Sequence, residues 1–278
     1  RTHPFQRTTA MSLVRNLFCS SLGKKYIMAL TGLALIGFLT GHLVGNLQVF
    51  SHPDKINGYA HFLQHLGPAL WAVRGSLLAI VALHIWAMTA LTLENVQARP
   101  VKYGVKRFIE ASWASRSMRW TGFIIAAFLV YHLMQFTIGS SSGFFTGGSF
   151  KTRIDEYVMQ GDFHLFGLPI LAAGAKVHDV HTMMVLGFQN VLVSLFYIVA
   201  VTLLGIHIWH GFESAFQSLG LRTSRWGNFL RGATRLFAIG YILGSIAIPA
   251  AVLAGVVKVG GCCPAATAAH SACCPDNQ

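Results

Sequence analysis

The chain has 278 residues, of which 54% are hydrophobic and only 11% are charged, and its mean hydropathy is +0.54. Soluble domains carry about 25% charged residues, so this composition excludes an ordinary soluble domain and predicts an integral membrane protein. The formal net charge of +12 does not indicate a nucleic-acid partner, because basic residues in a membrane chain commonly mark its cytoplasmic side.

Three parts are expected along the chain: a cytoplasmic N-terminal arm (1–25), a transmembrane domain (26–258) and an external Cys-rich tail (259–278). A membrane-spanning helix needs about 20 mostly apolar residues. Five runs qualify, covering residues 26–50, 69–93, 118–138, 187–212 and 234–257. The predicted fold is therefore all-α, a bundle of five transmembrane helices. Because the first run is a full span behind a basic stretch, we expect no cleavable signal peptide.

The basic residues are unevenly divided between the two sides of these spans. The side that carries the N-terminal arm and the second and fourth loops holds 15 of the 21 lysines and arginines. They are Arg1, Arg7, Arg15, Lys24, Lys25, Arg99, Lys102, Lys106, Arg107, Arg116, Arg119, Arg222, Arg225, Arg231 and Arg235. The positive-inside rule then predicts a cytoplasmic N-terminus and an external C-terminus.

The third loop (139–186) is external on this topology, and its Gly-, Ser- and Phe-rich sequence predicts an irregular lid or a disordered segment.

Four of the five apolar runs carry a histidine near the end at which the chain leaves the membrane: His42, His84, His132 and His207. An ionisable side chain inside hydrocarbon is costly and by default indicates a functional site. The direction of each span places His42 and His132 in the outer half of the membrane, and His84 and His207 in the inner half. Two histidines from two helices at each depth is what bis-histidine ligation of two stacked haems requires. About ten helical residues separate the layers, or roughly 15 Å.

Other interpretations of single residues remain open at this point. Any one histidine could be a packed side chain bonded to a carbonyl of a neighbouring helix. His210 follows His207 by three residues on roughly the same face, and we expect it beside the haem while the deeper His207 binds iron. Gly37, Gly41 and Gly45 recur every four residues, a spacing that suits close helix packing and also a flat wall against a porphyrin.

The segment Gly41-His42-Leu43-Val44-Gly45-Asn46-Leu47 resembles the first-helix motif of the cytochrome b subunits of succinate dehydrogenases and fumarate reductases, in the class with one five-helix, di-haem anchor. Tyr131-His132 and the His-x-x-x-Gly sequence 207–211 resemble the same family, and the resemblance covers about residues 24–258. In that family each of the first four helices provides one haem ligand and the fifth provides none, as in 234–257 here.

The resemblance implies a complex in a bacterial cytoplasmic membrane, embedded in membrane lipid. A flavoprotein oxidises succinate, an iron–sulfur subunit docks on the cytoplasmic face, and electrons cross two haems b to menaquinone or ubiquinone. The chain would thus be an enzyme subunit, with succinate oxidation on other subunits. It has no dinucleotide-binding fingerprint and no ferredoxin-type cysteine spacing, so we expect no catalytic residue here beyond the quinone site.

One departure from the family concerns the quinone. Some members have an acidic residue near the start of the second helix, whereas residues 66–74 contain no carboxylate and Arg74 occupies that neighbourhood. We expect a quinone site near the outer haem, between the starts of spans two and four, with Arg74, His61 and His65 as polar contacts. The alternative is an arginine that extends to the interface beside two surface histidines.

Two other functions are compatible with the same histidines, and the C-terminal tail has a cysteine pattern of its own. The chain could be the haem-b anchor of another respiratory enzyme, such as a hydrogenase or formate dehydrogenase, or a transporter with an intramembrane histidine proton relay. In the tail, a Cys-Cys-Pro sequence occurs at 262–264 and again at 273–275. An external compartment permits disulfides there, and zinc bound with His270 is the alternative.

Overall fold

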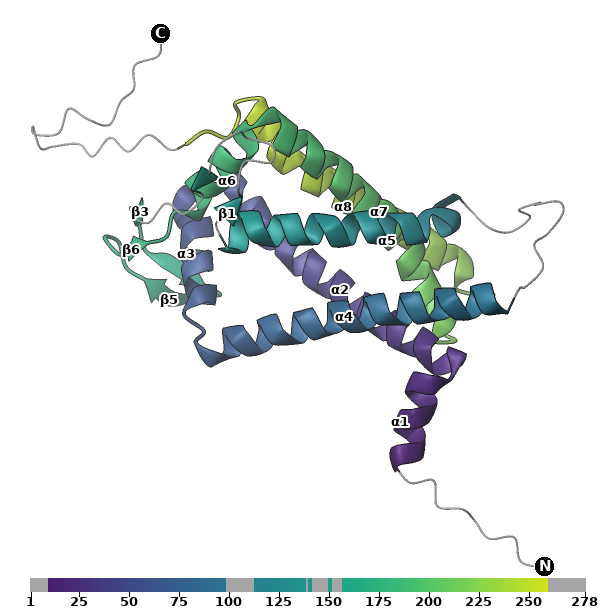
Figure 1. Cartoon of the computed structure of the whole chain (residues 1–278). Coiled ribbons are helices and arrows are strands. Elements are labelled where there is room, and N and C mark those ends of the chain that lie inside the picture. The colour runs from purple at the N-terminus through teal and green to yellow at the C-terminus, as the bar shows by residue number, and fades with distance from the viewer. Residues whose placement is uncertain (1–9, 99–112, 139, 142–149, 152–156, 260–278) are drawn as a thin grey trace, which may run out of the picture.

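The computed structural model describes residues 10–98, 113–138, 140–141, 150–151 and 157–259 (Figure 1). Five of its helical segments are long and apolar enough to cross a membrane, so the chain is a multi-pass, all-α membrane protein. These segments are Ser21–Phe50, Pro68–Gln97, Ser115–Ile138, Val191–Ser218 and Gly227–Leu253. The predicted number of spans is confirmed, while the basic second loop and the Cys-rich tail lie outside the described residues.

The first span begins earlier than its hydropathy suggests. A short helix, α1 (Ala10–Cys19), precedes α2 (Ser21–Asn46), and the Ser20 hydroxyl between them accepts a hydrogen bond from the Gly23 amide at 3.0 Å. This cap, and not the onset of apolar sequence, determines where α2 begins. The part of the chain predicted as a basic arm therefore contains one helix and the first turn of a second.

Lys24 is a buried charged residue in α2, and its charge is tolerated because it has an ionic partner. It pairs with Glu94 on α4 (Pro68–Gln97), and the Ser21 hydroxyl donates to the same carboxylate at 2.7 Å. A buried charge is tolerated only when it is paired in this way. The contact joins the first turn of α2 to the last turns of α4, so it stabilises the antiparallel arrangement of these two helices.

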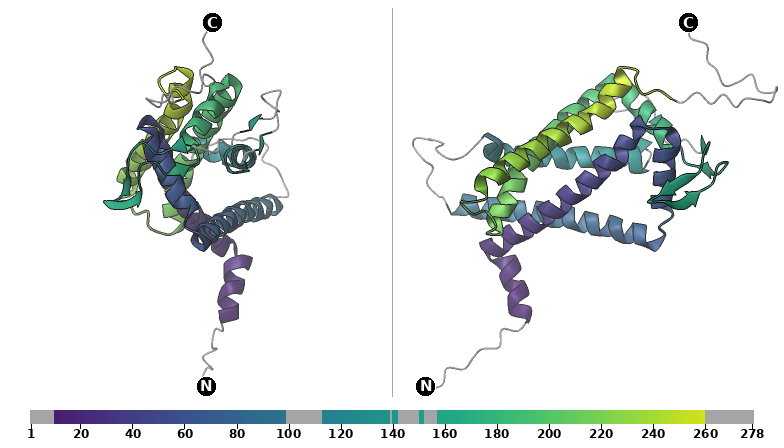
Figure 2. Two further views of the ribbon diagram at one scale, coloured as in Figure 1. Left: turned by 90° about the vertical axis from the view of Figure 1, so that its left-hand side faces the viewer. Right: turned by 180° about the vertical axis from the view of Figure 1, so that it is seen from behind.

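The helices α2 and α4 diverge from this contact toward their other ends, where α3 (Pro53–Gln64) connects them (Figures 1 and 2). Most of the α4 surface is exposed, and only Ala87 and Leu91 on this helix are buried. An apolar helix with so little protein contact must place most of its surface against lipid or against a bound group.

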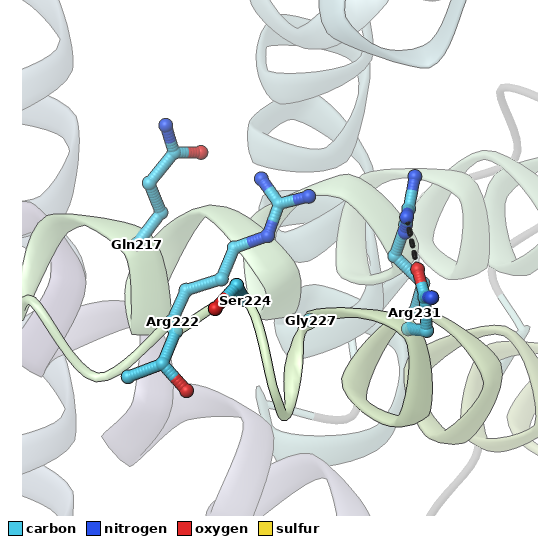
Figure 3. A pocket seen from close by; sticks show the side chains of 7 residues that line it. Gln217, Arg222, Ser224, Gly227 and Arg231 are labelled. Atoms are coloured by element: carbon cyan, nitrogen blue, oxygen red, sulfur yellow. Dashed lines mark hydrogen bonds between the residues drawn. The ribbon is translucent and has the colours of Figure 1, made fainter.

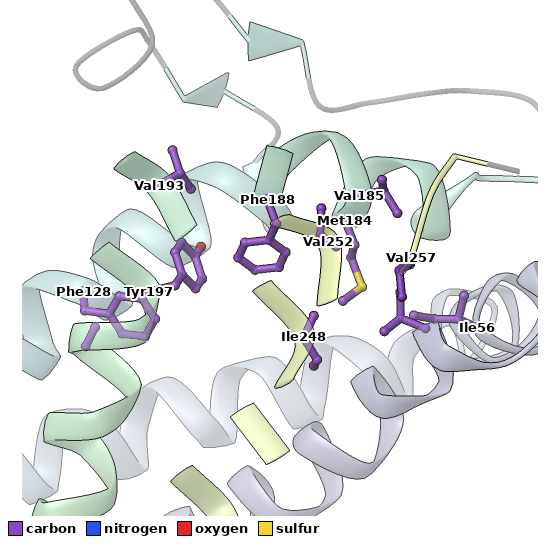
Figure 4. Packing of buried hydrophobic residues seen from close by; sticks show 12 residues of the cluster. Ile56, Phe128, Met184, Val185, Phe188, Val193, Tyr197, Ile248, Val252 and Val257 are labelled. Carbon is purple, nitrogen blue, oxygen red and sulfur yellow. The ribbon is translucent and has the colours of Figure 1, made fainter. Parts of the chain in front are cut away.

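The other spans form the denser part of the bundle. The antiparallel pair α7 (Val191–Ser218) and α8 (Gly227–Leu253) lies beside α5 (Trp113–His132), which continues as a π-helical segment (Leu133–Ile138). A cluster of twelve buried residues joins these spans to α3 and to a short helix, α6 (Val180–Gln189) (Figure 4). It consists of Val49, Ile56, Phe128, Met184, Val185, Phe188, Val193, Tyr197, Ala200, Ile248, Val252 and Val257.

The fourth span begins later than predicted, because residues 187–189 belong to a separate helix, α6 (Val180–Gln189). Asn190 breaks the chain at ψ 116°, and its side-chain oxygen accepts from the Val193 amide at 3.1 Å to cap α7. The hydroxyl of Ser194 then binds the Phe188 carbonyl at 2.5 Å. A polar cap inside an apolar run thus divides what hydropathy alone presents as one helix.

The residues of the third loop that the structure describes include regular structure, contrary to the irregular segment that the composition predicts. Among them are three antiparallel strand pairs, β1–β2, β3–β6 and β4–β5. The strands are Ser140–Ser141, Phe150–Lys151, Tyr157–Val158, Phe163–Leu165, Leu168–Leu171 and Lys176–Val177. Strands of two to four residues are too short for an alternating pattern to be recognised.

We call α3, β3–β6 and α6 together the cap. Its centre is polar, and both ends of the Asn57 side chain are paired: the amide donates to Asp179 at 3.2 Å and the oxygen accepts from the His181 amide at 3.0 Å. Asn57 is 0% exposed. Gly58 lies so close to the Phe163 ring that an added Cβ would approach within 2.5 Å of it. These contacts fix α3 against α6 and the strands at one end of the bundle.

Candidate functional site

The structure brings the four intramembrane histidines together as two interhelical pairs. At the end of the bundle that carries the cap, His42 of α2 faces His132 of α5, and their ring centres are 5.7 Å apart. Toward the end that carries α1, His84 of α4 faces His207 of α7, with ring centres 6.5 Å apart. We call these the cap-side pair and the arm-side pair.

The spacing within each pair fits one metal atom between two imidazoles. A nitrogen that ligates a transition metal lies about 2 Å from it, and the ring centre lies roughly 1 Å behind that nitrogen, so two axial imidazoles have centres about 6 Å apart. Both pairs lie close to this value. Two imidazoles are too few for a zinc ion, which takes four ligands, but they are the complete axial set of a haem iron.

Two threonines determine which nitrogen of the arm-side pair is free. The Thr31 hydroxyl lies 3.0 Å from Nδ1 of His84, and the Thr121 hydroxyl lies 3.1 Å from Nδ1 of His207. Each hydroxyl is also within bonding distance of a carbonyl in its own helix, Ile27 for Thr31 and Met118 for Thr121.

A hydroxyl has a single proton to donate. If that proton goes to the helix carbonyl, the hydroxyl must accept from Nδ1–H of the imidazole. The neutral ring then carries its proton on Nδ1 and leaves the lone pair of Nε2 unoccupied, as a metal ligand requires. With this arrangement the threonines favour, for both arm-side imidazoles, the tautomer in which Nε2 can ligate a metal.

The cap-side pair is supported by an aromatic side chain. The Tyr197 hydroxyl lies 3.3 Å from Nδ1 of His132 and donates to the Gln135 side-chain oxygen at 2.9 Å. Tyr197 and Gln135 are 5% and 2% exposed. By the same proton count, Tyr197 accepts from Nδ1–H of His132, which again leaves Nε2 free. Gln135 lies in the π-helical segment, a distortion that is frequent at functional sites.

These supporting residues were missed by the sequence analysis, although a signal for them exists. Thr31-Gly32 and Thr121-Gly122 are both Thr-Gly sequences, and a histidine of the cap-side pair follows each threonine by eleven residues. In both helices the glycine lies against the arm-side imidazole: an added Cβ would be 3.3 Å from His84 at Gly32 and 3.7 Å from His207 at Gly122. Each repeat thus combines a threonine hydroxyl that contacts the arm-side imidazole, a glycine that lets this imidazole approach the helix, and a cap-side histidine three turns further along.

The glycines around His42 differ from one another. An added Cβ at Gly37 or Gly41 would meet no atom within 4 Å, whereas one at Gly45 would lie 2.9 Å from the Tyr59 ring. Gly45 therefore serves close packing of α2 against α3. Gly37 and Gly41 leave a flat, open helix wall beside the cap-side histidine, which is compatible with the edge of a planar group.

Of the two candidate histidines on α7, the ring that faces His84 is that of His207. His210 lies about one turn further along the helix and is half-buried. His210 therefore lies next to the arm-side pair, but its ring is not the one that faces His84.

The residues predicted near the quinone are only partly brought together. His61 on α3 and His65, which ends that helix, stack with ring centres 3.8 Å apart. Burial, and secondarily the nearby His65, keep the pKa of His61 below its usual value. Arg74 lies two turns into α4, with its guanidinium 5.1 Å over the Trp71 ring. The start of α4 follows α3 and stands apart from the start of α7 (Figures 1 and 2).

A scan of protein-family models and searches of curated proteins and of solved structures found no match to this chain. Support for a function therefore comes from the histidine pairs and the side chains around them.

Proposed function

We propose that this chain is the membrane-anchor cytochrome b of a succinate:quinone oxidoreductase. In this role it holds two bis-histidine haems b and carries electrons from an iron–sulfur subunit to a membrane quinone. The observation that carries the proposal is the pair of ring spacings, 5.7 and 6.5 Å, between imidazoles from different helices. The resemblance of residues 41–47 to the first-helix motif of this family supports the choice among haem proteins.

In this proposal some residues would bind the haems and others would orient the ligands. His42 and His132 would hold one haem, and His84 and His207 the other. Thr31, Thr121 and Tyr197, through their hydrogen bonds to Nδ1, would orient three of these imidazoles and keep Nε2 available. Haem iron, when bound, supplies one-electron transfer between its ferric and ferrous states.

The two pairs lie at different depths, as an electron relay across the bilayer requires. Thr31, beside the arm-side pair, and His42, in the cap-side pair, are eleven residues apart on one helix, and so are Thr121 and His132. At 1.5 Å per helical residue this separation is about 16 Å.

The direct proton-relay alternative is less well supported by the same geometry. In the part of the chain that the structure describes, no hydrogen bond joins two of the four imidazoles. The Nδ1 contacts of three of them, His84, His207 and His132, go instead to Thr31, Thr121 and Tyr197. A direct relay needs imidazoles joined by a hydrogen bond, whereas a shared axial metal needs a gap of the size that both pairs have.

The partners follow from the proposed role. The flavoprotein and the iron–sulfur subunit would dock on the cytoplasmic face, which holds α1 and the basic second and fourth loops. The quinone, menaquinone or ubiquinone, would bind near the cap-side haem with Arg74 as a polar contact. Replacing Arg74 by Leu should then raise the KM for quinone while both haem spectra stay unchanged, and unaltered quinone kinetics would remove Arg74 from the site.

The deciding experiment is purification of the complex through this chain from membranes of a cell that expresses it. We expect two haems b per chain, an α band that appears on dithionite reduction, and co-purified flavin and iron–sulfur subunits with succinate:quinone reductase activity. Haem with a different partner, such as a hydrogenase, would reassign the anchor to that enzyme. A purified, folded chain without haem would refute the proposal and favour the transporter.

A further inference from the structure

The turn between α7 and α8 contains a basic pocket that the proposed electron transfer does not use (Figure 3). Its volume is about 320 Å³, and its lining includes Gln217, Arg222, Ser224, Asn228 and Arg231. Each of these side chains can donate a hydrogen bond, and two are guanidinium groups. The pocket thus presents a concentration of donors suited to an anionic oxygen ligand.

The charges around the pocket are held in place and only partly neutralised. Arg222 lies 3.2 Å from the carboxylate of Glu213, its ion-pair partner. Arg231 donates to the neutral side chain of Asn228. Glu213 thus pairs with one of the two guanidinium groups of the lining, and the other has a neutral partner. The fourth loop carries a third basic residue, Arg225, in the same segment of sequence. The planar guanidinium group matches phosphate oxygens better than a point charge does.

The pocket lies at the level where two apolar spans end, at the last turn of α7 and the first turns of α8. Trp226 and Phe229 next to it are 58% and 67% exposed, and their ring centres are 5.8 Å apart. Exposed aromatic residues of this kind mark the boundary between headgroups and hydrocarbon. Leu236, two turns further along α8, is 73% exposed. The pocket, with its hydrogen-bond donors, thus lies at the boundary between headgroups and hydrocarbon, next to the exposed apolar face of α8.

From these features we infer that the α7–α8 pocket binds the phosphate of an anionic phospholipid, with the acyl chains along the exposed face of α8. Basic pockets between transmembrane helices on the cytoplasmic side recognise such headgroups. The inference depends on the five spans and on the charges of this turn. It does not depend on the haem proposal, so each can fail without the other.

The test uses the full chain, purified in detergent and analysed by native mass spectrometry after addition of phosphatidylglycerol or phosphatidylcholine. We expect retention of phosphatidylglycerol in preference to the zwitterionic lipid. Arg231→Gln leaves the Arg222–Glu213 ion pair intact and should weaken phosphatidylglycerol binding about fivefold. Arg222→Gln together with Arg231→Gln should weaken it about 25-fold. Arg225→Gln is the matched control, because it removes the same charge from the same loop outside the pocket lining.

Four results would overturn the inference. The first is undiminished phosphatidylglycerol binding in both pocket variants, and the second is an equal loss in Arg225→Gln, which would indicate unspecific attraction by the loop. The third is displacement of the lipid by millimolar inorganic phosphate, which would indicate a site for a free anion. If the wild type binds neither lipid but the pocket variants lose an acidic partner subunit, the pocket is a protein-docking site and the lipid assignment is wrong.

Discussion

The two histidine pairs have similar ring spacing, yet the protein holds them by different means. The cap-side pair lies beside the twelve-residue cluster that contains Phe128, Phe188 and Tyr197, and Tyr197 anchors His132 through a buried phenol. The arm-side pair lies beside a smaller cluster, Leu204, Ile208 and Tyr241. There the anchors are threonine hydroxyls bonded to their own helices.

This difference indicates that dense packing is not required to orient an imidazole inside a membrane. Where aromatic side chains pack closely, a phenol and a glutamine fix the ring through tertiary contacts. Where fewer buried side chains surround the ring, as at the arm-side pair, a hydroxyl attached to a rigid helix does the same through local geometry. The cap-side pair should therefore be more sensitive to changes in packing, and the arm-side pair to changes in hydrogen bonding.

If the proposed function holds, the largest expected effect is the loss of one haem when one of its proposed histidine ligands is removed. His42→Ala and His132→Ala should each reduce the haem content from two to one per chain and should leave the same spectrum. His84→Ala and His207→Ala should leave the other spectrum. A pyridine haemochromogen assay and the redox-dependent α band measure both quantities.

His210→Ala is the control for this series, because His210 lies near His207 without facing His84. It should retain both haems. Loss of the arm-side haem in His210→Ala, with retention in His207→Ala, would exchange their roles. Two haems remaining in all four single variants would contradict the ligand assignment as a whole.

The next effect concerns the cap-side support. Tyr197→Phe removes the hydroxyl that accepts from His132 and leaves Gln135 buried without that donor, a cost of about 1–3 kcal/mol in stability. Since the hydrogen bond from Nδ1–H increases the basicity of the imidazole and favours ferric iron, its loss should raise the potential of the cap-side haem. Optical redox titration and thermal denaturation test the two parts, and an unchanged potential would refute the positioning role of Tyr197.

A smaller effect is expected at the arm-side pair, where Thr31→Val and Thr121→Val remove the anchor with little change in shape. A hydrogen bond of about 1 kcal/mol corresponds to roughly 40 mV for a one-electron couple, so the arm-side potential should rise by that order in each variant. Thr40→Val is the matched control, because the Thr40 hydroxyl bonds the Ile36 carbonyl of its own helix at 2.7 Å. Equal shifts in all three variants would mean that the threonines act only on helix structure.

The smallest effect is a pH dependence confined to the cap. His181 is 4% exposed, and burial lowers its pKa below 6.5, partly opposed by Asp179 and by a hydrogen bond to the Val49 backbone, with His52 adding to the decrease. The opened cap then binds more protons than the closed one at acidic pH, so cap stability should fall as the pH drops through about 6.5.

Hydrogen exchange of the α6 amides at pH 7.5 and 5.5 measures this stability. His181→Gln should weaken the pH dependence, and exchange near the arm-side pair should not change with pH in the same way. Equal α6 protection at both pH values would show that His181 is not the titrating group.

Much of the fold follows from sequence because the membrane imposes a simple rule on composition. Five apolar runs predict five spans, and the structure confirms five helices of sufficient length. The ends of the helices are harder to predict from hydropathy, because they depend on single polar side chains. Ser20 and Asn190 determine where α2 and α7 begin, and a hydropathy average does not detect one capping residue.

For the candidate site, the sequence alone determined which histidines lie in the spans and, through the direction of each span, which of them share a depth. Only the tertiary structure decided which rings face each other and what holds them. Thr31, Thr121, Tyr197 and Gln135 are ordinary residues in apolar helices until the helices cross. Depth is a property of position along one chain segment, whereas a hydrogen bond between helices depends on their relative rotation and distance, which packing of the whole bundle determines.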